Sequence, residues 1–144
     1  MRVVLDTNVI ISATLTRGGN EHRVLRAWGR GRFDLVFSPA MLEELGRALM
    51  YERLRKYRWM TEPEVITLLE ALAHSSELVP GTVTVKASRD PDDDKFLGAA
   101  IEGVADYVVT GDRDLLDLSR YESVRMVTAR AFLAILRQGG RRKT

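Results

Sequence analysis

The stretch VVLDTN (residues 3–8) places an aspartate and an asparagine directly after a short run of strand-forming apolar residues. A carboxylate at the end of a buried strand is costly to remove from water unless a cation or hydrogen-bond donors meet it. We therefore expect the Asp6 carboxylate to be balanced either by hydrogen-bond donors of the protein or by a bound cation.

Short apolar runs alternate with helical patterns along the rest of the chain. Strands are expected at 3–5, 33–37, 83–85, 107–109 and 123–128, and helices at 40–54, 64–76, 91–103 and 129–138. Ser38 with Pro39, a capping box from Thr61 to Glu64, and Asp90 with Pro91 mark the first three helix starts. This alternation predicts an α/β fold, a three-layer doubly wound (Rossmann-like) mostly parallel sheet of about five strands with helices on both faces.

Length and composition suit one domain, which we expect over 1–138, followed by a basic, flexible tail over 139–144. The chain has 144 residues, of which 45% are apolar and 29% charged. No apolar run reaches the roughly 20 residues of a membrane helix, and the start of the chain lacks a secretory signal pattern, so we expect a cytoplasmic location.

The absence of cysteine narrows the chemistry that the chain can carry. Disulfides, thiolate nucleophiles, zinc–thiolate sites and iron–sulfur clusters are excluded, because the sequence has no cysteine. A metal must be held by oxygen or by His22 or His74, and neither histidine has a partner at metal-ligand spacing.

Charge is unevenly distributed although the formal net charge is only +2. Acids gather at 90–94 and 111–114, and cations at 137–144 and 53–59. In one interpretation the second basic stretch contacts nucleic acid through Arg53, Arg55, Lys56 and Arg58, with the rings of Tyr57 and Trp59 stacking on bases. In the other, the two rings pack in the core or at a dimer contact.

Four acids are predicted to meet at one edge of the sheet. Asp6 and Asp112 follow two strands, and ligands of a parallel sheet bind beyond the carboxyl ends of its strands. At about 100° per residue, Glu44 flanks the apolar stripe of its helix and Asp94 shares the inward face of the next, while Asp92 and Asp93 point away. Glu43 and Asp114 remain the alternatives to Glu44 and Asp112.

A divalent cation is the natural counter-charge for converging carboxylates. Mg²⁺ and Mn²⁺ prefer oxygen ligands, and one or two such ions promote phosphodiester cleavage by activating water and stabilising the leaving oxygen. Asp6, Glu44, Asp94 and Asp112 are then the predicted ligands. Asn8 would orient Asp6, and Thr110 would contact water or phosphate.

The motifs VVLDTNVIIS, SPAMLEEL, DPDDDKFLGAAI and DYVVTGDRDLL resemble, in the same order, the four acidic motifs of the PIN-domain nucleases. The chain is similar to PIN proteins described as toxin components of toxin–antitoxin pairs, such as the VapC-type toxins. The resemblance implies a PIN-like fold, dependence on Mg²⁺ or Mn²⁺, and cleavage of single-stranded RNA. It also implies a homodimer and a small antitoxin protein as partners.

Two other functions stay open at this point. A binding module for RNA or protein retains the acidic site without turnover. A haloacid-dehalogenase-type phosphatase also begins with a strand that ends in aspartate, but its motif requires a second aspartate where this sequence has Asn8.

Overall fold

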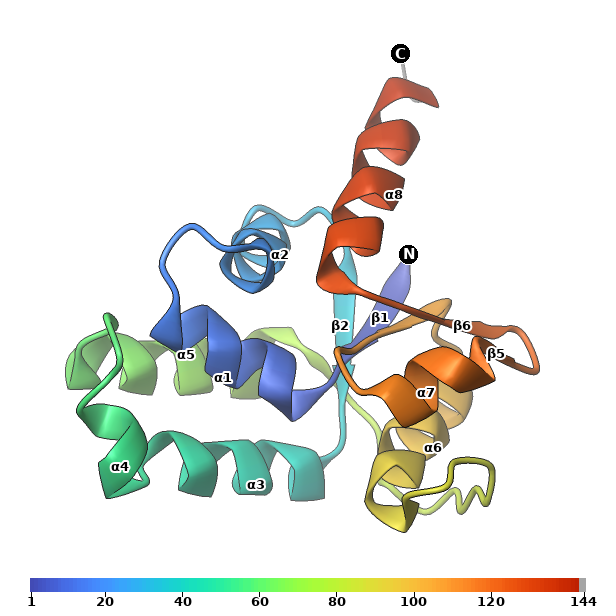
Figure 1. Ribbon diagram of the computed structural model, residues 1–144, viewed down its shortest axis with the longest axis horizontal. Helices are drawn as coiled ribbons and strands as arrows, with labels where there is room; N and C mark the ends of the chain where they lie inside the picture. The colour runs from blue at the N-terminus through green and yellow to red at the C-terminus, as the bar shows by residue number, and fades with distance from the viewer. Residues whose placement is uncertain (143–144) are drawn as a thin grey trace.

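A single sheet, covered by helices on both faces, organises the computed structural model, which describes residues 1–142 (Figure 1). Within these residues the strand order is β3-β2-β1-β4-β6-β5. All pairs are parallel except β5 with β6. The doubly wound α/β fold predicted from the sequence is therefore confirmed. The strands are β1 (Arg2–Leu5), β2 (Asp34–Phe37), β3 (Glu77–Leu78), β4 (Tyr107–Val109), β5 (Arg120–Tyr121) and β6 (Val124–Val127).

The helices form the outer layers of the molecule. In Figure 1, α1, α3 and α5 lie on one side of the strands, and α6 and α7 lie on the other. None of the described helices is long and apolar enough to cross a membrane. The helices are α1 (Thr7–Leu15), α2 (Asn20–Gly29), α3 (Pro39–Leu49), α4 (Glu52–Arg55), α5 (Glu62–Ser75), the 3₁₀ turn η1 (Pro91–Asp93), α6 (Asp94–Glu102), α7 (Arg113–Leu118) and α8 (Ala129–Arg142).

The central strands are apolar along their length because helices cover both faces of the sheet. Val4 and Leu5 of β1 and Val108 and Val109 of β4 are fully buried. The two strands pair in parallel, with Leu5 opposite Val109. Their carboxyl ends therefore lie side by side, and the residues that follow them emerge at the same edge of the sheet.

The predicted helix starts are confirmed by their caps. The Ser38 side chain accepts a hydrogen bond from the backbone of Met41, with Pro39 in the first turn of α3. Thr61 and Glu64 form the predicted capping box of α5. Because these side chains satisfy backbone N–H groups that have no partner inside a helix, they fix where α3 and α5 begin.

The strand predicted at 83–85 is absent, and this prediction is wrong. The edge strand is instead β3, and the chain after it crosses α6, where Glu102 accepts hydrogen bonds from the Gly81 backbone and the Thr82 hydroxyl, both at 2.7 Å. Val83 comes so close to α6 that a Cβ at Gly98 would lie 2.6 Å from its carbonyl oxygen. Contacts with α6 override the strand preference of this segment.

The last helix also differs from its predicted end at Gly139–Gly140. Helix α8 continues through both glycines to Arg142. A glycine inside a helix costs only about 1 kcal/mol relative to alanine, so glycine alone does not end one. The tail predicted to be flexible over 139–144 is thus helical as far as Arg142, and Lys143 and Thr144 lie outside the described residues.

Candidate metal centre

The site begins where β1 and β4 end. The backbone N–H of Asp6 donates to the Val109 carbonyl at 2.9 Å, and that of Thr110 donates to Val127 at 2.9 Å. These bonds continue the strand ladder by one residue and place Asp6 and Thr110 next to each other. The edge lies between β1 and β4, where the strand order reverses, and open α/β sheets bind ligands at this point.

Asp6 is held rigidly in a buried position. Its side chain is 2% exposed, and its two oxygens accept hydrogen bonds from the Asn8 backbone at 3.0 Å and the Thr110 hydroxyl at 2.8 Å. Burial raises the pKa of Asp6, although both hydrogen bonds oppose that rise. Asn8 acts here through its backbone N–H and its side chain is exposed, whereas Thr110 is buried as part of the site.

Thr110 also links Asp6 to the loop that carries the next acids. Its hydroxyl oxygen accepts from the backbone of Asp112 at 3.0 Å, and Asp112 in turn caps α7 by accepting from the Asp114 backbone at 2.8 Å. A third acid, Asp93, comes from η1. Asp93, Asp112 and Asp114 each offer one ligand atom, and these atoms lie within 4.8 Å of one another.

The environment of Asp93 indicates what kind of ligand this cluster can bind. It is 6% exposed, and its Oδ2 is buried without a hydrogen-bond partner among the described residues. Burial, together with the negative charge of Asp112, raises the pKa of Asp93 to about 7. A buried carboxylate oxygen without a donor, beside two further carboxylates, fits an oxygen-loving divalent cation such as Mg²⁺ or Mn²⁺.

The orientation predicted for the acids of the DPDDD stretch is corrected by the structure. Asp93 points into the cluster, whereas Asp94 accepts hydrogen bonds from the backbones of Ala87 (3.2 Å) and Ser88 (2.8 Å) and so holds the preceding loop. The inward face of α6 differs from the predicted one: its buried residues are Phe96, Leu97, Gly98, Ala99 and Ala100, whereas Val104 is 73% exposed. Asp93 precedes Leu97 by four residues and Ala100 by seven, so it lies on this buried side.

Glu44 lies on the inward side of α3 but outside the group of three acids. Its carboxylate pairs with Lys95 at 2.5 Å, whereas its rival Glu43 is exposed and pairs with Arg47 at 2.8 Å. The sequence analysis had given Lys95 no role. Its only sequence signal is its position next to the acids of DPDDD, and its positive charge lowers the pKa of Asp6 slightly.

The basic stretch 53–59 is largely taken up by contacts within the protein. Arg55 pairs with Glu62 at 2.5 Å, and Arg58 donates to the Leu49 carbonyl at 2.7 Å. The Trp59 indole donates to Ala13 at 2.9 Å, so this ring packs within the protein, whereas Tyr57 is 76% exposed. Arg53 and Lys56 are exposed.

Residues 2–114 match the PIN domain. The chain belongs to the PIN-domain family. PIN domains are generally nucleases, and the acids that this PIN domain gathers at the ends of β1 and β4 suit a nuclease-like module. It is similar to the uncharacterized protein MJ1680 of Methanocaldococcus jannaschii, with 33% identity over 118 residues that cover 82% of this chain and 75% of the relative.

Proposed function

We propose that this PIN domain is a metal-dependent endoribonuclease that cleaves phosphodiester bonds of single-stranded RNA. One observation carries the proposal: the Oδ2 atom of Asp93 is buried without a donor among residues 1–142, inside a group of three carboxylates. Such an arrangement is unfavourable for the protein alone, since like charges repel and a buried carboxylate without a partner is costly. A bound cation removes both penalties.

The residues of the site have separate roles in this proposal. Asp93, Asp112 and Asp114 would hold one or two ions of Mg²⁺ or Mn²⁺. When bound, the metal activates water for attack on phosphorus and neutralises charge on the phosphate and the leaving oxygen. Asp6 would form the buried wall of the site. The Thr110 hydroxyl would hold Asp6 and the loop of Asp112 in place, because it hydrogen-bonds to both.

The asparagine at position 8 disfavours the phosphatase alternative. A haloacid-dehalogenase-type enzyme uses this aspartate as its nucleophile and needs a second aspartate two residues later as acid and base, but residue 8 is asparagine. The non-catalytic binding module uses the same acids as the nuclease, so these two functions differ only in turnover.

The test is cleavage of labelled single-stranded RNA and DNA by purified protein with Mn²⁺, Mg²⁺ or EDTA. Asp112→Asn is the informative variant, and Asp117→Asn is its matched control, because Asp117 is exposed on α7 and loses the same charge. We expect metal-dependent cutting of RNA that is lost only in Asp112→Asn. Manganese binding in calorimetry without cleavage of any substrate would favour the binding module, and hydrolysis of a phosphate monoester through a phosphoaspartyl intermediate would favour the phosphatase.

The partners implied by the family resemblance belong to the same proposal. As a toxin component, the protein would form a homodimer and be inhibited by a small antitoxin that blocks the acidic site with an arginine. Purification from a native host, followed by light scattering, tests both ideas. A monomer without any co-eluting small protein would remove the toxin role and leave the nuclease activity unaffected.

A further inference from the structure

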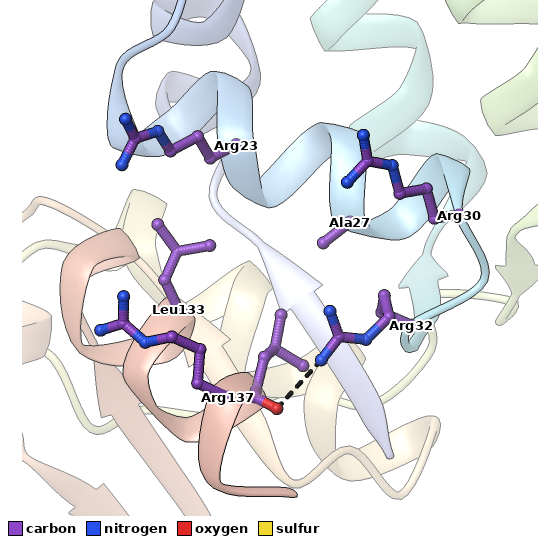
Figure 2. A pocket seen from close by; sticks show the side chains of 7 residues that line it. Arg23, Ala27, Arg30, Arg32, Leu133 and Arg137 are labelled. Atoms are coloured by element: carbon purple, nitrogen blue, oxygen red, sulfur yellow. Dashed lines mark hydrogen bonds between the residues drawn. The ribbon is translucent and has the colours of Figure 1, made fainter. Parts of the chain in front are cut away.

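Four arginines surround a cavity at the end of the sheet opposite the acidic cluster. Helix α2 ends at Gly29, shortly before β2 begins, and α8 packs against α2 on its way back from the end of β6. The cavity between these helices has a volume of about 230 Å³. We call it the arginine pocket (Figure 2); its lining residues are Arg23, Ala27, Arg30, Arg32, Leu133, Leu136 and Arg137.

Helical spacing brings these side chains together. Arg23 and Ala27 lie four residues apart on one face of α2, Arg30 follows three residues later at the C-cap of that helix, and Leu133 and Arg137 lie four apart on α8. Figure 2 shows the arginines around a floor of Ala27 and leucine side chains. The result is a small apolar depression with guanidinium groups at its rim.

The charge of the arginine pocket is not balanced inside the described part of the chain. No acid lines the pocket, and none of its four arginines forms an ion pair there. Arg32 donates to the Leu136 carbonyl at 3.0 Å and so links the start of β2 to the middle of α8. Within the described residues, the guanidinium groups of the other three arginines form no side-chain hydrogen bond. The pocket therefore has the chemistry of an anion site.

We propose that the arginine pocket binds one phosphate-bearing nucleotide of a single-stranded RNA, at a distance from the phosphate that is cleaved. This inference rests on the proposed function. A guanidinium group can donate two parallel hydrogen bonds to phosphate oxygens, and it can also stack on a base. The apolar floor of the pocket can contact the face of a base or sugar. The cavity lies below the usual range of about 300–1,000 Å³ for drug-sized ligands, which suits a single nucleotide unit.

The position of the pocket suits a long strand better than an acidic peptide. Strand β1 has four residues, so at about 3.3 Å per residue it separates the two ends of the sheet by about 13 Å. Nucleic acid carries a phosphate at every nucleotide, so a strand held at the acidic cluster brings further phosphates towards the arginines. A peptide would find two helices here, whose backbone groups are already paired, instead of an open strand edge.

The test is RNA binding in EDTA, followed by fluorescence anisotropy, because this measurement needs no cleavage. The probe is a labelled oligo-uridylate of about 20 nucleotides, longer than the roughly 4–16 nucleotides that one single-strand site covers. The test variant is R30Q/R137Q. Its control is R26Q/R130Q, which removes one exposed arginine from α2 and one from α8, both outside the pocket.

We expect R30Q/R137Q to weaken binding about 10-fold and to lower the slope of log K against log salt by about 0.7 for each phosphate that the variant no longer neutralises. The control should change affinity less than 2-fold. Equal losses in both variants would mean that only total charge matters, and no loss in either would mean that RNA does not use the pocket. Either result overturns the inference, as does binding of a glutamate-rich peptide in place of RNA. Cleavage assays remain separate, so the nuclease and the arginine pocket can fail independently.

Discussion

The two ends of the sheet carry charge in opposite ways. At the carboxyl ends of β1 and β4, Asp6 and Asp93 are buried, and hydrogen bonds of 2.8 Å hold Asp6 and Asp112. At the other end the arginines are exposed, and only Arg32 donates a side-chain hydrogen bond within the described residues. A small ion needs ligands held in place before it arrives, whereas a flexible polyanion can be met by long, mobile side chains. Substitutions at the acidic end should therefore have large, specific effects, and those at the basic end small, salt-dependent ones.

The largest expected effect separates two neighbouring acids. Asp93→Asn should lower RNA cleavage about 10³-fold, since a lost ligand forfeits several kcal/mol of charge stabilisation. Asp94→Asn should lower it less than about 10-fold, because the amide oxygen still accepts from Ala87 and Ser88. Cleavage rates at saturating Mn²⁺ measure both. If Asp94→Asn were the inactive variant, the acid chosen by helical spacing would be correct and the cluster around Asp93 would not be the metal centre.

A smaller loss is expected from Thr110→Val, which keeps the shape of the side chain but removes its hydroxyl. Asp6 then loses a donor and the Asp112 backbone loses an acceptor. Contacts of this kind behind metal ligands typically contribute 10–100-fold, so we expect a loss of about that size in manganese affinity measured by calorimetry. Thr14→Val is the control, because Thr14 is also fully buried and its hydroxyl donates only to the Ile11 carbonyl within α1. Equal affinities in the two variants would show that the hydroxyl does not organise the site.

The same carboxylates should make the metal-free protein sensitive to pH. The pKa of Asp93 is raised from 3.8 to about 7, so between these values the folded state binds a proton that the unfolded chain has lost. The free energy of unfolding in EDTA should therefore fall as pH rises from about 4 to 7, by at most about 1.36 kcal/mol per pH unit from this group, and level off above.

Urea unfolding at several pH values, with and without Mn²⁺, measures this effect. Asp93→Asn should be more stable than the original protein in EDTA at pH 8, because it has no buried charge to destabilise it. Manganese should stabilise the original protein more at pH 8 than at pH 6, since the ion competes with the proton. If Asp93→Asn were no more stable than the original protein in EDTA at pH 8, other groups of the protein would already offset the charge of the buried Asp93 carboxylate.

The sequence predicted the acidic end of the sheet better than the basic end. Asp6 and Asp112 follow apolar strands, and the pairing of two parallel strands brings them together without further information. Asp93 was missed because α6 is apolar over most of its surface, and spacing alone did not show that the side with Leu97 and Ala100, four and seven residues after Asp93, is the buried one. The strand expected at 83–85 failed because Gly98 lets that segment pack on α6, a contact between distant residues.

The arginine pocket was beyond sequence analysis for a related reason. The arginines of α2 lie on one face of a helix that the sequence analysis did not predict, and the other half of the pocket comes from α8, more than a hundred residues later. Local patterns can place a residue on a helix face, but they do not determine which helix packs against that face. This limit does not apply to acids that follow neighbouring parallel strands, because the strand order already places these acids at the same edge of the sheet.

The smallest expected effect is the stability change in Arg30→Gln. Arg30 is exposed and forms no ion pair among the described residues, so the free energy of unfolding should change by less than about 0.5 kcal/mol. Any change should be a gain, because repulsion between the guanidinium groups is relieved. It should shrink in salt, since screening acts over about 10 Å at 0.1 M. Urea unfolding at low and high salt measures this, with Asp93→Asn in EDTA at pH 8 for comparison, whose effect should persist because buried charges are screened less. A loss above about 1 kcal/mol would mean that Arg30 packs as part of the fold, and the two ends of the sheet would then no longer differ in how they hold charge.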